Sequence, residues 1–192
     1  MKDKLIKILN EHLLSVFETG QTFYYFKKNI NPYLVDLGLT LDNFPEEGEE
    51  DLWDPNQAYN KNLSTENLEL IFNTYSAFYY ETKRYSFMID NSSSRPYWQY
   101  YKINKCESEI CNSLDDKVFL FSDPFWDKFY PPNHPGCNTM IRALDKQEVE
   151  NKNLQLVNGS DIVHPFPDWA FNPAKTDWRK FFGEFVLNTF AI

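Results

Sequence analysis

The chain has 192 residues, 42% of them hydrophobic and 18% aromatic, which is enough for one well-packed domain or for a domain with a smaller appended unit. Its formal net charge of −9 argues against a protein whose main partner is nucleic acid, because surfaces that bind phosphates are basic. The longest apolar runs fall short of the roughly 18 residues that span a bilayer, so the sequence predicts no membrane protein. Three cysteines, an odd and small number, favour a reducing compartment over a disulfide-stabilised fold.

The N-terminal part is predicted to be helical. Apolar residues recur every three or four positions between residues 3 and 19, and Gly20 stands where a helix commonly ends. A second short helix is expected to end before Pro32, because proline lacks the amide donor that a helix interior requires. Residues 42–54 contain seven acidic residues and no basic one, which is typical of a solvated segment or, alternatively, of a strip that docks a basic partner. We therefore expect residues 1–60 to form a helical extension with an acidic linker.

A long amphipathic helix and a small sheet are expected next. The helix should run from Ser64, a favourable N-cap, to about Met88, because its apolar and aromatic residues follow the helical period. Alternating and β-prone residues predict three strands, at 95–103, 117–121 and 138–144, and the tail predicts a helix at 177–190. The predicted fold class is α+β: a helical N-terminal part, then a small antiparallel sheet with long loops rich in aromatic residues and proline.

Residues 123–137, DPFWDKFYPPNHPGC, are the stretch around which the rest is organised. Pro124, Pro131, Pro132 and Pro135 remove backbone donors at a density that excludes a regular helix or a central strand. The aromatic side chains nearby, those of Phe125, Trp126 and Phe129, supply apolar surface that would fix such a loop to the domain. We expect this stretch to form an ordered loop, with the remaining helices and strands as the scaffold that supports it.

All three cysteines and one of the three histidines lie within 32 residues of one another. Four residues separate Cys106 from Cys111, two separate His134 from Cys137, and 22 lie between the two pairs. Two short-spaced pairs of thiolate and imidazole side chains are typical of a structural zinc site. The sequence thus predicts Cys106, Cys111, His134 and Cys137 as metal ligands and zinc as the ion, with ordinary buried cysteines as the alternative.

No motif in the sequence identifies an enzyme. It contains neither G-x-S-x-G nor H-E-x-x-H, and neither a P-loop nor a dinucleotide fingerprint. Asp123 and Asp127 lie four residues apart, but paired carboxylates in a proline-rich loop are more typical of turn caps. His134 and Cys137 share one turn without a third group to orient them, so a thiol nucleophile is not expected. We predict no catalytic residue.

Several motifs follow one another in a distinctive order: RPYWQYYKI, DPFWD, PPN, HPGC and PDWAFNPAK, at 95–103, 123–127, 131–133, 134–137 and 167–175. In this order they resemble the phage Mu F-like head morphogenesis family of minor capsid proteins. The chain departs from the family pattern in five places. Asn104 replaces an aspartate, Ser108 a cysteine, Asp116 a glycine, Asn138 and Thr139 an Arg-Cys pair, and Ala174 a glycine. The resemblance therefore implies a metal site that keeps Cys111, His134 and Cys137 and has lost or shifted its fourth ligand.

The resemblance implies a structural role. The protein would be a minor head protein of a phage or prophage that contributes to head assembly through contacts with portal or capsid proteins, without catalysis. Residues 61–192 would form the family domain, and the protein would occupy the host cytoplasm before assembly and the virion head afterwards. Two alternatives stay open: an enzyme, such as a nuclease or a transferase-like toxin-associated domain, that uses the Cys/His loop, and a metal-stapled interaction module.

Overall fold

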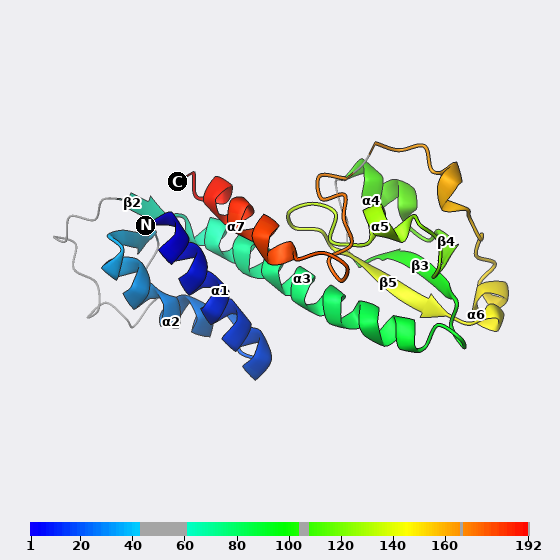
Figure 1. Ribbon diagram of the computed structural model, residues 1–192, viewed down its shortest axis with the longest axis horizontal. Coiled ribbons are helices and arrows are strands. Elements are labelled where there is room, and N and C mark those ends of the chain that lie inside the picture. Colours follow the sequence, from blue (N-terminus) through cyan, green and yellow to red (C-terminus); the bar gives the residue numbers. More distant parts are fainter. Residues whose placement is uncertain (43–60, 104–107, 166, 192) are drawn as a thin grey trace. The chain divides into compact units, whose positions relative to one another are not determined.

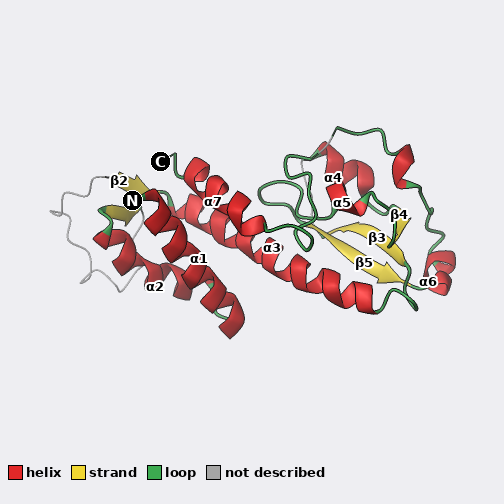
Figure 2. Ribbon diagram, viewed as in Figure 1, coloured by secondary structure: helices red, strands yellow, loops and turns green. Residues whose placement is uncertain are grey.

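The computed structural model describes residues 1–42, 61–103, 108–165 and 167–191, which fall into two compact units. One unit comprises Met1–Tyr75 and Arg179–Ile192, and the other comprises Ser76–Trp178. Helices dominate the N-terminal part and a small antiparallel sheet follows, so the predicted α+β class is confirmed (Figures 1 and 2). The boundary expected near residue 60 stays a prediction. Within the described ranges, no helix is both long and apolar enough to cross a membrane.

Helix α1 (Lys2–Thr19) confirms the first helix that the sequence predicts. Its buried residues, Leu5, Leu9, Leu13 and Val16, recur at the three- and four-residue spacing that places them on one face. Gly20 ends the helix with a φ of 70°, a left-handed conformation that glycine adopts without steric cost, and the Gly20 N–H donates to the Val16 carbonyl.

Helix α2 (Phe23–Asp36) continues through Pro32, so the expected end of this helix before Pro32 is wrong. Pro32 lies on the exposed side of the helix. Ile30 and Leu34 on the other side are fully buried, and each such burial stabilises the fold by about 1.5–3 kcal/mol. Together they offset the cost of about 3 kcal/mol for a proline inside a helix.

Aromatic rings connect the remaining elements of this first unit. Phe72, on the long helix α3 (Thr65–Asp90), packs against Phe17, Phe23 and Phe26, with ring centroids 4.9, 5.4 and 5.5 Å away. Helix α7 (Trp178–Thr189) confirms the predicted terminal helix and places Phe182 5.1 Å from the ring of Tyr75. Two short strands, β1 (Leu39–Leu41) and β2 (Lys61–Leu63), pair in parallel, which the sequence analysis did not predict.

The second unit is built on a three-stranded antiparallel sheet in the order β4-β3-β5. Strands β3 (Tyr97–Lys102), β4 (Val118–Leu120) and β5 (Thr139–Leu144) match the three predicted strands. Helix α4 (Glu109–Leu114) connects β3 to β4, and helix α6 (Lys146–Asn151) follows β5. A 3₁₀ turn, η2, spans Gly159–Asp161. Trp98 and Tyr100, both on β3, are fully buried at the centre of the core.

Residues 123–137 contain a single helical turn, α5 (Trp126–Phe129), where the sequence predicted a loop without helix. The prolines flank this turn instead of interrupting it, and the Pro131–Pro132 peptide bond is cis. The ring of Phe125 stacks between those of Phe119 and Phe129, with centroids 4.1 and 4.6 Å away. The indole N–H of Trp126 donates to the Leu120 carbonyl over 2.9 Å. The aromatic residues thus fix the segment to the core, as predicted.

The PDWAFNPAK segment packs on this same stretch, although about 40 residues separate them in sequence. The Asn172 amide donates to the Trp126 carbonyl over 3.1 Å, and the Lys175 ammonium lies 2.6 Å from the Asp127 carboxylate. The Trp169 N–H donates to the Asn133 carbonyl over 3.1 Å. Two motifs that the sequence shows as separate stretches therefore form one structure.

Asp123 and Asp127 have structural partners, as expected for turn caps. The Asp123 carboxylate accepts from the backbone N–H groups of Phe125, over 2.8 Å, and Gly159, over 2.9 Å. It thereby connects the start of α5 to η2. A Cβ atom at Gly159 would overlap both Asp123 and the Cβ of Phe125, so this close approach requires glycine.

Substitution Gly159→Ala should therefore lower the free energy of unfolding of the second unit by about 1–3 kcal/mol, the usual cost of an added methyl group without space. Urea unfolding followed by tryptophan fluorescence measures this, because Trp98, Trp126, Trp169 and Trp178 belong to this unit. The neighbouring Ser160→Ala, at an exposed position, is the control and should change stability by less than half as much. Equal effects of the two substitutions would contradict the steric argument.

Candidate functional site

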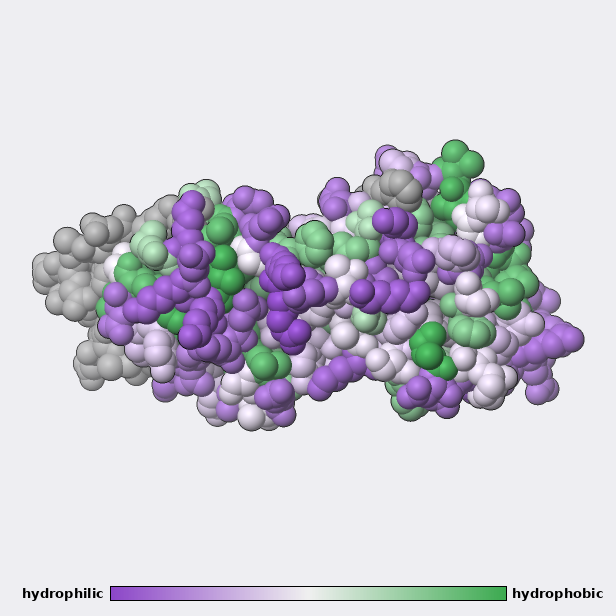
Figure 3. Space-filling model, viewed as in Figure 1, coloured by the Kyte–Doolittle hydropathy of each residue, from purple (hydrophilic) through white to green (hydrophobic). Residues whose placement is uncertain are grey.

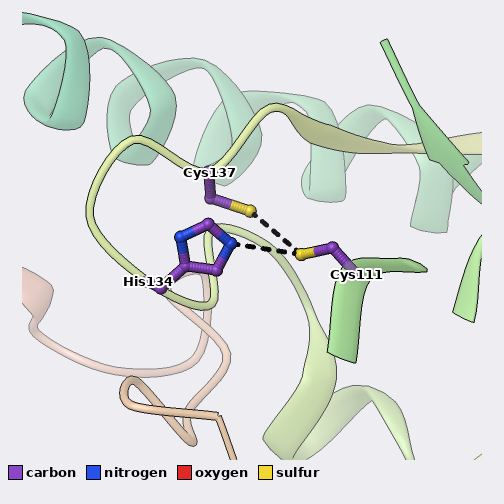
Figure 4. Close-up of side chains that lie close together, drawn as sticks. All are labelled: Cys111, His134 and Cys137. Carbon is purple, nitrogen blue, oxygen red and sulfur yellow. Dashed lines mark hydrogen bonds between the residues drawn. The ribbon is translucent and has the colours of Figure 1, made fainter. Parts of the chain in front are cut away.

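Cys111 lies on the buried side of α4. This helix buries Ile110, Cys111 and Leu114, and Cys111 is fully inaccessible. Its side chain therefore points from the helix into the core of the second unit, towards the turn that precedes β5 (Figure 4).

His134 and Cys137 lie on that turn. The Cys137 N–H donates to the His134 carbonyl over 3.2 Å, which closes the turn, and Gly136 between them has a φ of 68°, a conformation suited to glycine. Cys137 is buried, whereas His134 is half-buried. The H-x2-C spacing thus places both side chains on the same side of one tight turn.

Asn133, immediately before His134, holds the turn in place. It is fully buried, and its amide N–H groups donate to the Tyr100 hydroxyl and, over 3.3 Å, to the Phe129 carbonyl. Its backbone carbonyl accepts from the backbone N–H of Trp169. In the sequence, Asn133 is marked only as part of the PPN motif, and neither its role nor that of Tyr100 is predicted. The one feature of the sequence that could have indicated this role is that Asn133, with its polar amide, stands among aromatic and proline residues.

The three side chains converge in space. The Cys111 sulfur lies 3.2 Å from Nε2 of His134 and 3.8 Å from the Cys137 sulfur (Figure 4). All three potential ligand atoms lie within 4.8 Å of one another. The structure therefore brings together three of the four residues that the sequence predicts as metal ligands. The fourth, Cys106, lies outside the described residues and stays a prediction.

Hydrogen bonds set the protonation of the cluster. Nδ1 of His134 lies 2.9 Å from the Pro135 carbonyl, a contact that requires the proton on Nδ1 and leaves the lone pair of Nε2 facing Cys111. Hydrogen bonding to Cys137, together with burial, raises the pKa of Cys111 to about 11. The hydrogen bond from Cys111, with backbone hydrogen bonds from Asn133 and Thr139, lowers the pKa of Cys137 to about 7. Cys137 is therefore the thiol of the pair that ionises first.

A cavity of about 200 Å³ adjoins the half-buried side of His134. Its lining includes Ser108, Glu109, Asn133, His164 and Asp168. Nδ1 of His164 is buried and has no hydrogen-bond partner among the described residues. The cluster is thus closed on the side of the cysteines and open to polar groups on the side of the histidine.

The comparisons with known proteins agree with the motifs that end at HPGC, and PDWAFNPAK lies beyond the matched residues. The family model described as "Phage Mu protein F like protein" matches residues 7–142, which is most of the chain. The protein belongs to the phage Mu F family. The match includes α1 and α2, which the sequence analysis left outside the resemblance.

Two relatives of the Mu F family share about the same identity with the chain. The "Mu-like prophage FluMu F protein" of Haemophilus influenzae is 29% identical over 140 residues, which cover 72% of this chain and 31% of the relative. The "Putative capsid assembly protein F" of Escherichia phage Mu is 29% identical over 102 residues, which cover 53% of this chain and 23% of the relative. The matched parts thus span a third or less of each relative. No solved structure matches the chain.

Substitution Asn133→Ala tests whether Asn133 stabilises the turn that carries His134 and Cys137. Because it leaves buried hydrogen-bonding groups without partners, it should lower the free energy of unfolding of the second unit by about 1–3 kcal/mol. Urea unfolding followed by tryptophan fluorescence measures the loss. Asn138→Ala removes the same amide from an exposed position on the same turn and is the matched control. A loss of equal size in the control would contradict the anchoring role.

Glu81, on α3, contacts residues 123–137 through Tyr130. The Tyr130 hydroxyl donates to the Glu81 carboxylate over 3.2 Å. Burial raises the pKa of Glu81 to about 7, against smaller opposing effects of Arg84 and Tyr130. The native state therefore holds a proton that the unfolded chain releases near pH 4.5. As pH rises from about 4.5 to 7, this one group lowers the free energy of unfolding by about 2–3 kcal/mol.

Glu81→Gln removes this titration and keeps an acceptor for Tyr130. Relative to the wild type, the variant should gain stability with rising pH across that window and stay level above it, as measured by urea unfolding at a series of pH values. Glu69→Gln, at an exposed position of the same helix, should follow the wild type. Parallel pH profiles for the wild type and Glu81→Gln would refute the assignment.

Proposed function

We propose that this protein is a minor head protein of a Mu-like phage or prophage, which contributes to head assembly through contacts with portal or capsid proteins. Membership of the phage Mu F family carries this proposal, together with a relative named as a putative capsid assembly protein. In this proposal the protein occupies the bacterial host cytoplasm before assembly and the virion head afterwards.

The packing of the family motifs supports a structural role for them. Asn172 and Lys175 of PDWAFNPAK bind the Trp126 carbonyl and the Asp127 carboxylate of DPFWD, and the PPN asparagine is buried. These residues hold the second unit together. Because these residues bind one another within the second unit, they would keep that unit rigid when it contacts other head proteins.

Helix α2 offers a surface for protein–protein contact. Tyr25 and Tyr33 are 52% and 46% exposed, and Tyr24 beside them is 39% exposed. The ring of Tyr33 packs against that of His12, with centroids 4.6 Å apart, which limits its motion. Exposed tyrosines on a rigid helix are favourable interface residues, because they bury much area at low cost in side-chain entropy. On the face drawn in Figure 3, strongly hydrophobic residues form only separate patches among hydrophilic ones.

Co-purification tests the proposal directly. The tagged protein, expressed with portal and major capsid proteins from the same phage genome, should retain at least one of them, and particles from an induced prophage should contain the protein. Tyr25→Ser combined with Tyr33→Ser should weaken the retained interaction about tenfold or more, which corresponds to about 1.4 kcal/mol.

Phe87→Ser is the control, because Phe87 is 70% exposed and belongs to the second unit. It should leave binding unchanged. Equal loss in both variants would place the contact elsewhere than on α2. A protein that binds neither partner and is absent from purified particles would not be a head protein.

A further inference from the structure

We propose that Cys111, His134 and Cys137 bind one zinc ion, which connects α4 to the turn before β5. Metal binding is independent of the proposed role in head assembly, and it rests on the arrangement of the three side chains. Ligands on two elements 23–26 residues apart meet at one point in the core, and each is held by its own local structure.

The distances fit the coordination geometry of zinc. Bonds of about 2.3 Å to sulfur and 2.0 Å to nitrogen place two sulfurs of a tetrahedral site about 3.8 Å apart, and sulfur and nitrogen about 3.5 Å apart. The corresponding distances here are 3.8 Å between the sulfurs and 3.2 Å from the Cys111 sulfur to Nε2 of His134. The ligand atoms of the third pair, Cys137 and His134, lie within 4.8 Å of each other. A shift of about 1 Å in that pair, with a few tenths of an ångström elsewhere, would complete the geometry.

The donor atoms also have the chemistry that zinc prefers. Thiolate and imidazole ligands select this ion over calcium or magnesium, which prefer oxygen. The hydrogen bond from Nδ1 of His134 to the Pro135 carbonyl fixes the ring with Nε2 towards the sulfurs, as is common for histidines that bind metals. Buried Asn133 holds the same turn, so little order has to be created when the ion binds.

Hydrogen bonding alone does not match this arrangement as well. Hydrogen bonds satisfy both contacts of Cys111 only when Cys137 donates to Cys111 and Cys111 donates to Nε2 of His134. Both bonds are weak, because a thiol is a weak donor and its sulfur a weak acceptor. A cation satisfies all three electron pairs at once, and the half-buried side of His134, next to the polar cavity, leaves a route for the ion and for a further ligand.

Metal analysis of the full chain, purified without added zinc or chelator, is the test. One equivalent of zinc is expected by mass spectrometry. Cys111→Ser, His134→Ala and Cys137→Ser should each reduce zinc content at least fivefold. His12→Ala removes an imidazole from the first unit and is the matched control for His134→Ala: zinc should stay near one equivalent. Equal loss of zinc in His12→Ala and His134→Ala would overturn the assignment.

Measurements on the wild type keep the test valid if a variant does not fold. X-ray absorption of the zinc-loaded wild type should show sulfur and nitrogen neighbours at zinc, and a spectrum with oxygen or nitrogen neighbours alone would overturn the site. Removal of zinc with a strong chelator should lower the thermal midpoint of unfolding by roughly 10 °C, reversibly on return of zinc. A wild type that neither contains zinc nor takes it up, or that pairs Cys111 with Cys137 as a disulfide under reducing conditions, would refute the proposal.

Discussion

Burial of the aromatic side chains of residues 123–137 is the interaction on which the second unit depends. Phe125, Trp126, Phe129 and Tyr130 all lie in the core, next to Trp98 of the central strand. Each buries a large apolar area, so their combined contribution exceeds that of any hydrogen bond in the unit. Four prolines limit the backbone between and around these anchors, and this leaves the chain few alternative paths from β4 to β5.

The polar contacts of the unit follow from that packing. Once α5 is fixed, its carbonyls and carboxylates become the docking points for residues that come later in the chain, Asn172 and Lys175 among them. Asn133 is carried into the core by the same segment and there positions the turn with His134 and Cys137. The Cys/His cluster is thus a consequence of how the segment is anchored, and a bound ion would reinforce a connection that the aromatic residues have already made.

The strengths and limits of sequence prediction can be seen in particular residues. The periodic leucines of α1 and the alternating residues of β3 predict these elements well, because each pattern reflects one buried face. The end of α2 at Pro32 was wrong, because burial of Ile30 and Leu34 outweighs a local preference. The turn of α5 was missed because Pro124 and Pro131 were counted as interruptions, when they lie on either side of it. The pairing of β1 with β2 has no signal in two three-residue strands.

The sequence by itself determined the α+β class, the order of the main helices and of the three strands of the sheet, and the Cys and His residues to consider as ligands, because composition, periodicity and spacing are local properties. It also identified the family through the order of its motifs. Only the tertiary structure decided that Cys111 meets His134 and Cys137, that Asn133 supports them from within the core, and that PDWAFNPAK docks on DPFWD. These contacts join residues 23 to 46 positions apart, and such contacts form only when the aromatic core has set the path of the chain between them.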